Sequence, residues 1–204
     1  MKLHAAFLRG INVGGHKLVS MNRLAQAFES LDFKNVRTLL ASGNVLFDAP
    51  PRSRAGLVRR IEARLEQTFG HEITVILRRL DELQALAALN PFRRIRVTPR
   101  TRLFVTFLSE KPRTRLKIPY TSPDKSFRIL RLARGEVCSV LTLGPQWSRN
   151  LRQMDILEKE FGKKITTRSW STVLRVLGAA AHPGGGVTGA PGYNAGRPFM
   201  RDAR

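Results

Sequence analysis

The order of hydrophobic patterns along residues 3–77 restricts this chain to a small set of folds. An apolar run over 3–8 predicts a buried strand, and a helical pattern follows Ser20, a residue type that can cap a helix. Two β-rich runs, over 35–41 and 45–48, are then separated by a short polar turn. Such a turn between two β-rich runs is typical of a β-hairpin.

A second helix and a fourth strand complete this pattern. Ser53 can cap a helix that ends near Gly70, with Leu57, Ile61 and Leu65 on its inward face. Alternating residues over 72–77 predict another strand. The resulting order, β-α-β-β-α-β, is that of the ferredoxin-like split βαβ arrangement, with helices on one face of an antiparallel sheet. We therefore predict an α+β subdomain of this type over residues 1–79.

The second half of the chain predicts another small α+β unit. Its elements are a helix over 81–89 capped by Asp81, strands over 103–108, 127–132 and 137–143, a helix from Asn150 to Phe161 and a last helix over 171–177. We assign this unit to residues 80–178. Residues 179–204 are rich in Gly and Pro and carry few large apolar side chains, so we expect a disordered tail.

The cysteine count and the start of the chain favour the cytoplasm. Cys138 is the only cysteine, which excludes an intramolecular disulfide and a four-cysteine zinc site. Arg9 interrupts the first apolar run too early for a signal peptide, and no stretch has the length of a membrane span. We therefore expect a cytoplasmic protein with no membrane partner; the sequence leaves its oligomeric state open.

Positive charge is the most unusual bulk property of the chain. The net charge is +21, and residues 93–134 contribute 13 basic against two acidic side chains. A field of this sign attracts polyanions, so we predict a basic binding protein for a polyanion such as nucleic acid. The candidate contacts are Arg93, Arg94, Arg96, Arg100, Arg102, Arg113, Arg115 and Lys117. The alternative is compositional, because 27 of the 36 cations are Arg, as a GC-rich genome produces without selection for binding.

Two polar loops form a second candidate site. The hairpin turn should open at the sheet edge where the first strand ends, because the third strand is expected to run antiparallel to the first. Backbone N–H groups, Arg and amide side chains would suit a small anionic metabolite bound by an enzyme or a sensor. The residues are Arg9, Asn12, Gly14, Gly15, Lys17, Ser42 and Asn44. Alternatively, the two asparagines hold the turns locally and Arg9 pairs with a carboxylate.

Motifs for catalysis and cofactor binding are missing from the sequence. The glycine-rich loop lacks the Walker pattern, since Gly15 is followed by His16 and Lys17 by Leu18. There is no H-E-x-x-H or G-x-S-x-G motif, and Cys138 sits in an apolar run typical of a buried, inert thiol. We therefore predict no metal and no cofactor, and the question of enzymatic activity stays open. A protein-interaction module is a third alternative.

Three segments carry a family resemblance: Phe7 to Gly15, Ser42 to Phe47 and Thr166 to Val173. Together they resemble the bacterial family known as domain of unknown function (DUF) 1697, over roughly residues 1–178. The resemblance implies a compact α+β protein with ferredoxin-like subdomains, and it brings no established activity, cofactor or catalytic residue. Ser169 and Ser171 stand where the family usually has Asn.

Overall fold

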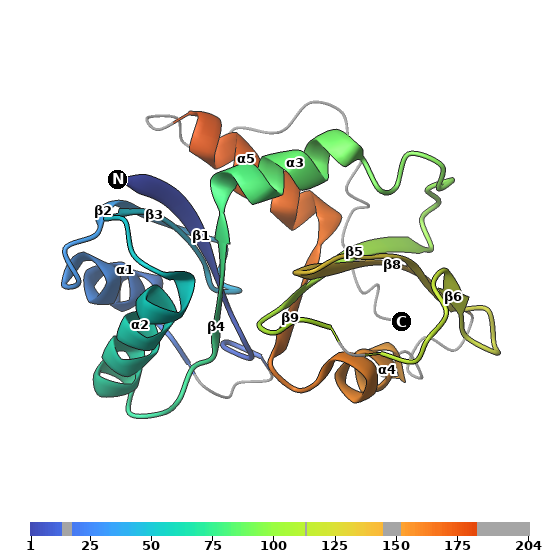
Figure 1. The fold of residues 1–204 in the computed structure, drawn as a ribbon, viewed down its shortest axis with the longest axis horizontal. Coiled ribbons are helices and arrows are strands. Elements are labelled where there is room, and N and C mark those ends of the chain that lie inside the picture. Colours follow the sequence, from blue (N-terminus) through green and yellow to red (C-terminus); the bar gives the residue numbers. More distant parts are fainter. Residues whose placement is uncertain (14–17, 113, 145–151, 183–204) are drawn as a thin grey trace, which may run out of the picture.

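The computed structural model describes residues 1–13, 18–112, 114–144 and 152–182. Two antiparallel sheets and five helices make up this part of the chain, which confirms the predicted α+β class. The two sheets lie beside each other, with helices on their outer sides and across one end (Figure 1).

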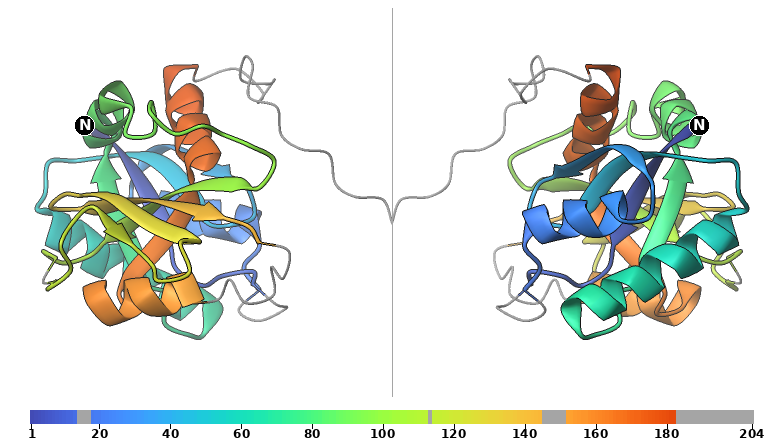
Figure 2. Two further views of the ribbon diagram at one scale, coloured as in Figure 1. Left: turned by 90° about the vertical axis from the view of Figure 1, so that its right-hand side faces the viewer. Right: turned by 90° about the vertical axis from the view of Figure 1, so that its left-hand side faces the viewer.

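The first sheet has the strand neighbours that the sequence predicted. Its elements are β1 (Lys2–Leu8), α1 (Met21–Glu29), β2 (Lys34–Leu39), β3 (Asn44–Ala49), α2 (Arg54–Phe69) and β4 (Val75–Arg79). The strand order is β2-β3-β1-β4, so that β3 lies between β2 and β1 and runs antiparallel to both. Helices α1 and α2 cover the outer face of this sheet (Figure 2, right). The finer ferredoxin-like description of this half stays a prediction.

Helix α2 forms where its caps and its apolar face predict. The Ser53 hydroxyl accepts a hydrogen bond from the Gly56 N–H, and Gly70 ends the helix in a left-handed conformation with φ 77°. Leu57, Ile61 and Leu65 are all buried. Ser20 also occupies the N-cap position of α1, although its side chain makes no cap hydrogen bond.

The second sheet contains two strands that the sequence did not predict. This half consists of α3 (Leu80–Leu89), β5 (Thr101–Leu108), β6 (Tyr120–Thr121), β7 (Phe127–Leu132), β8 (Glu136–Thr142), α4 (Arg152–Phe161), β9 (Ile165–Ser169) and α5 (Trp170–Ala181). The strand order is β6-β7-β8-β5-β9. Strand β6 is only two residues long, and β9 reads Ile-Thr-Thr-Arg-Ser, so neither shows an apolar periodicity.

Three apolar cores hold the elements together. The first lies between the first sheet and the helices α1 and α2, and the third lies between the second sheet and α4. The middle core joins the inner faces of both sheets to α3 and α5. Within it, the rings of Phe7 and Phe107 stack with centroids 4.2 Å apart. The two halves of the chain thus share one core.

Several predicted ends differ from the structure. Strand β4 spans Val75–Arg79 rather than 72–77, and it runs directly into α3. The predicted N-cap at Asp81 is therefore wrong: Arg79 holds that position, and its N–H donates to the Glu82 carboxylate at 2.8 Å.

The end of the last helix also differs. Helix α5 begins at Trp170, capped by Ser169, and reaches Ala181, three residues into the predicted tail. Its carbonyl at Ala179 accepts a hydrogen bond from Arg37 of β2. Asn150, predicted to cap α4, and residues 183–204 lie outside the described residues.

Candidate functional site

The two polar loops meet beside each other where β1 ends and β3 begins, as predicted. Phe7 lies opposite Asn44 in the β1–β3 register, and the Leu8 N–H donates to the Gly43 carbonyl at 2.9 Å. Gly43 has φ 73°, and a Cβ there would lie only 2.9 Å from the Leu8 Cβ. Glycine at this turn therefore permits both the left-handed backbone and the close approach of the two loops.

The amide side chains of these loops are used inside the protein. The Asn12 Nδ2 donates to the carbonyls of Val19 and Ala41 at 3.0 and 2.8 Å, and its Oδ1 accepts from the Val19 N–H. Asn44 is only 1% exposed, and its Nδ2 donates to the Leu39 carbonyl and to the Ser42 hydroxyl. Both asparagines thus stabilise the turns.

Arg168 of β9 completes this arrangement, and the sequence did not identify it. Its Nε donates to the Asn44 Oδ1 at 2.7 Å, and its Nη2 donates to the carbonyls of Leu8 and Ser42 at 2.7 and 2.9 Å. A longer bond of 3.3 Å reaches the Gly43 carbonyl, and Nη1 bonds within β9. One guanidinium therefore joins the three segments that carried the family resemblance.

The Arg168 guanidinium has no carboxylate partner among the described residues. The side chain is 8% exposed, and its guanidinium carbon lies 5.7 Å from the centre of the Phe7 ring. Burial lowers the pKa of Arg168 to about 10, so that the group stays charged at neutral pH. Carbonyl and amide oxygens and an aromatic face together replace the counter-ion.

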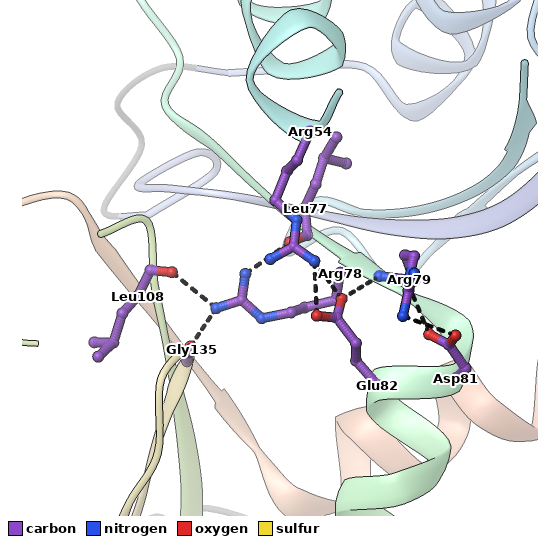
Figure 3. A network of polar contacts seen from close by, with 8 residues as sticks. All are labelled: Arg54, Leu77, Arg78, Arg79, Asp81, Glu82, Leu108 and Gly135. Atoms are coloured by element: carbon purple, nitrogen blue, oxygen red, sulfur yellow. Dashed lines mark hydrogen bonds and ion pairs between the residues drawn. The ribbon is translucent and has the colours of Figure 1, made fainter. Parts of the chain in front are cut away.

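Arg78 of β4 makes the reciprocal connection (Figure 3). Its Nη2 donates to the carbonyls of Leu108 and Gly135 in the second sheet, and its Nη1 donates to the Leu77 carbonyl. Burial also lowers the pKa of Arg78 to about 10. Arg78 of the first sheet thus bonds to carbonyls of the second half of the chain, and Arg168 of the second sheet bonds to carbonyls of the first half.

The remaining loop residues offer one partly exposed charge. Arg9 Nη2 pairs with the Glu158 carboxylate of α4 at 2.7 Å, with the two side chains 38% and 32% exposed. Gly14, Gly15 and Lys17 lie outside the described residues. Of the predicted small-anion site, Arg9 is therefore the one described cation, and it already has a carboxylate partner.

The basic segment divides into two groups on opposite sides of the second sheet. Alternate residues of β5 enter different cores, with Phe107 in the middle core and Leu108 in the core beside α4. Ile95 packs against the middle core, whereas Leu116 and Ile118 pack against the other. The cations of 93–102 therefore lie apart from Arg115 and Lys117, and Arg113 lies outside the described residues.

The first of these groups sits on an arm, which we define as residues 90–102. Phe92 anchors its start by packing edge-on against Trp170 at 5.3 Å. Hydrogen bonds between Thr98 and Thr101 close a turn near its end. The arm exposes Arg93, Arg94, Arg96, Arg100 and Arg102, and none of them forms an ion pair with a described carboxylate.

No group of three or more His, Cys, Asp or Glu side chains within the described ranges could hold a metal ion. Cys138 is buried, and burial together with the nearby Glu136 carboxylate raises its thiol pKa to about 12. At neutral pH Cys138 is therefore almost entirely the thiol, and very little of the reactive thiolate is present.

We expect Cys138 to resist a thiol-specific reagent in the native protein. Because it is the only cysteine in the chain, labelling at about pH 8 should reach less than about a tenth of its extent in denaturant. Absorbance of the released thiol product gives the measurement. Rapid, complete labelling without denaturant would contradict the burial of this residue.

The fold and its buried arginines define an α+β protein of two antiparallel sheets with a shared core. The chain belongs to the family of proteins of unknown function DUF1697, whose sequence model matches residues 1–129. No curated protein matches the sequence. In the described part of the chain, no helix has the length and apolar character that a membrane span requires.

Two solved structures match the chain, and the two matches differ greatly in quality. The conserved bacterial protein SP0830 from Streptococcus pneumoniae is 21% identical with a TM-score of 0.65, and the match covers 87% of this chain and 97% of that one. At this identity the likeness concerns the fold alone. An unknown protein from Galdieria sulphuraria is 12% identical over 82% of this chain and 96% of that one, and its TM-score of 0.23 is too low to inform the fold.

Proposed function

We propose that this protein is a cytoplasmic binding protein for nucleic acid, with the arm as its contact surface. The observation that supports this proposal is the set of five exposed arginines on the arm without ion-pair partners in the described part of the chain. Arginines whose charge is not neutralised by the protein attract phosphates and release the counter-ions of a polyanion. Arg115 and Lys117, across the second sheet, would belong to a separate contact.

The proposed contact is to the phosphate backbone rather than to the bases. Phe107 and Phe127, aromatic residues of the basic segment, are buried, and Phe92 packs inside the protein against Trp170. None of the three can stack on a base, which leaves the arm with charge alone. Phosphate contacts position a nucleic acid but carry no sequence information. We therefore expect similar affinity for unrelated sequences.

Neutralising two arginines of the arm tests the proposal. The double change Arg94→Gln and Arg96→Gln should weaken binding to a labelled DNA duplex about tenfold or more at about 50 mM salt. Fluorescence anisotropy measures the dissociation constant, with single-stranded RNA as a second probe. Lys34→Gln with Arg59→Gln is the matched control, since it removes two exposed cations from the first half of the chain.

The control should bind as the wild-type protein does. If neither nucleic acid binds at low salt, the proposal is overturned. An equal loss in the control would show that net charge alone causes the binding, and the arm would lose its special role.

A further inference from the structure

A small basic cavity lies at the end of the first sheet opposite the two polar loops. It has a volume of about 250 Å³, and its lining consists of Lys2, His4, Arg52, Arg54, Arg79 and the two prolines of 50–51. All of these residues belong to the first half of the chain, and none belongs to the arm. The cavity is therefore separate from the proposed nucleic-acid contact.

Strand register brings these residues together. Lys2 lies opposite Ala49, the last residue of β3, so that the segment 50–54 begins beside the start of β1. His4 lies opposite Arg79 on the other neighbour, β4. Since side chains alternate along a strand, Lys2 and His4 share the face of Ala6, which packs under α1 and α2. The His4 ring stacks on Phe47 at 5.7 Å, which fixes its place in the wall.

The cavity carries a positive charge that the protein does not fully compensate. Arg54 pairs with Glu82 at 2.6 Å and Arg79 with Asp81 at 3.0 Å, and these carboxylates hold the two guanidiniums in place (Figure 3). No carboxylate lines the cavity itself, and Lys2 and Arg52 pair with no carboxylate among the described residues. Four Lys and Arg side chains against two carboxylates leave two positive charges unbalanced.

We propose that this cavity binds the phosphate group of a small phosphomonoester. Two unbalanced positive charges match a doubly charged phosphate, and planar guanidiniums bind such oxygens in pairs of hydrogen bonds. The volume lies below the range typical of larger organic ligands, which restricts the ligand to a compact one. The proposal concerns a site in the first half of the chain and does not depend on the proposed nucleic-acid binding.

His4 gives this site a dependence on pH. Burial lowers the pKa of His4, and the positive fields of Arg54 and Arg79 act in the same direction, against a hydrogen bond to the Lys2 carbonyl and the field of Glu82. The ring therefore lies neutral among Lys2, Arg52, Arg54 and Arg79. A bound dianion would offset part of the positive field of these side chains and raise the pKa of His4. The protein would therefore take up a proton when the ligand binds.

Titration with inorganic phosphate and with glycerol phosphate tests the site. In calorimetry at constant ionic strength, both should bind the wild-type protein, and Arg52→Gln should bind about tenfold more weakly or worse. Arg59→Gln removes an exposed arginine of the same helix region that does not line the cavity, and it should bind as the wild type does. Glycerol phosphate should bind more tightly than inorganic phosphate, and equal or weaker binding would overturn the assignment to a phosphomonoester in favour of free phosphate. Absence of binding, or equal losses in Arg52→Gln and Arg59→Gln, would overturn the proposal.

A second titration isolates the role of His4. Sulfate keeps its double charge from about pH 5 to 8, so a change in its affinity over this range comes from the protein. Affinity should rise as the pH falls through the raised pKa of His4 in the complex, and it should level off below the lowered pKa of the free protein. His4→Gln should bind sulfate with little dependence on pH. An equal dependence in both proteins would show that a group other than His4 takes up the proton, and the proposed role of His4 would be overturned.

Discussion

Replacing Arg168 with methionine should lower the free energy of unfolding by about 3–5 kcal/mol. The guanidinium donates to the carbonyls of Leu8, Ser42 and Gly43 and to the Asn44 amide oxygen. Methionine fills much of the same volume but donates no hydrogen bond, so the Ser42 carbonyl and the Asn44 Oδ1 would lose this donor. The Gly43 carbonyl would keep its bond from the Leu8 N–H, and the Leu8 carbonyl its bond from the Thr166 hydroxyl. An unsatisfied buried acceptor costs about 1–3 kcal/mol, and two are affected together.

Urea unfolding followed by circular dichroism measures this change, with Arg175→Met as the control. Arg175 lies on α5, seven residues away, and is exposed, so the same substitution there should change the stability by less than about 0.5 kcal/mol. Arg168→Lys keeps the charge but not the planar set of donors, and it should fall between the two. A stability of Arg168→Met close to that of the control would show that the three segments hold together without this guanidinium.

Arg78 should contribute less than Arg168, although both link the two sheets. Arg78 donates three hydrogen bonds to carbonyls, and its Nε, unlike that of Arg168, has no hydrogen-bond partner among the described residues. Gly135 allows its approach, because a Cβ at this position would lie 2.9 Å from the guanidinium. The two arginines join the two sheets by hydrogen bonds, in addition to the middle core that both sheets share.

Local patterns were sufficient to predict most of the first half. Helix α2 follows from its cap, its apolar face and its terminal glycine, all of which are encoded within a few residues. The meeting of the two polar loops also followed from the sequence, because the order of strands determines which turns share a sheet edge. Boundaries were less accurate, as the direct passage from β4 into α3 illustrates.

The features missed by the sequence depend on contacts between distant residues. Strand β9 is almost wholly polar, and its burial follows from pairing with β5 rather than from its own periodicity. Arg168 bonds to residues more than 120 positions earlier, so no local pattern could assign its partners. The sequence feature that marks Arg168 is the polar Thr-Thr-Arg segment between two helical patterns, and this segment indicates only the family resemblance.

The basic segment shows that residues close together in the sequence can lie far apart in the structure. Its charges are close together in the sequence, yet the residues before and after β5 pack against different cores, with Ile95 against the middle core and Leu116 against the core beside α4. Charge density along a chain therefore overstates charge density on a surface. In the basic cavity, by contrast, residues far apart in the sequence lie together. Pairing of β1 with β3 and β4 brings Lys2 close to Arg79 and to Arg52, which follows β3.

Binding of nucleic acid by the arm should depend steeply on salt. If five arginines each neutralise a phosphate, the slope of log K against log salt should be about −4.5 on duplex DNA and about −3.5 on single strands. Affinity should then fall roughly 100- to 500-fold between about 50 and 200 mM salt. Anisotropy titrations at four or more salt concentrations would measure the slope for each nucleic acid.

The slope also identifies which cations make the contacts. Removing two phosphate contacts with Arg94→Gln and Arg96→Gln should make the duplex slope shallower by about 1.8, whereas the Lys34→Gln and Arg59→Gln control should keep the wild-type slope. A weaker affinity with an unchanged slope would mean that the two arginines act through the general field of the protein and touch no phosphate. If the slope instead responds to Arg115→Gln with Lys117→Gln, the interface lies across the second sheet, on the side of α4, and the arm is not the contact surface.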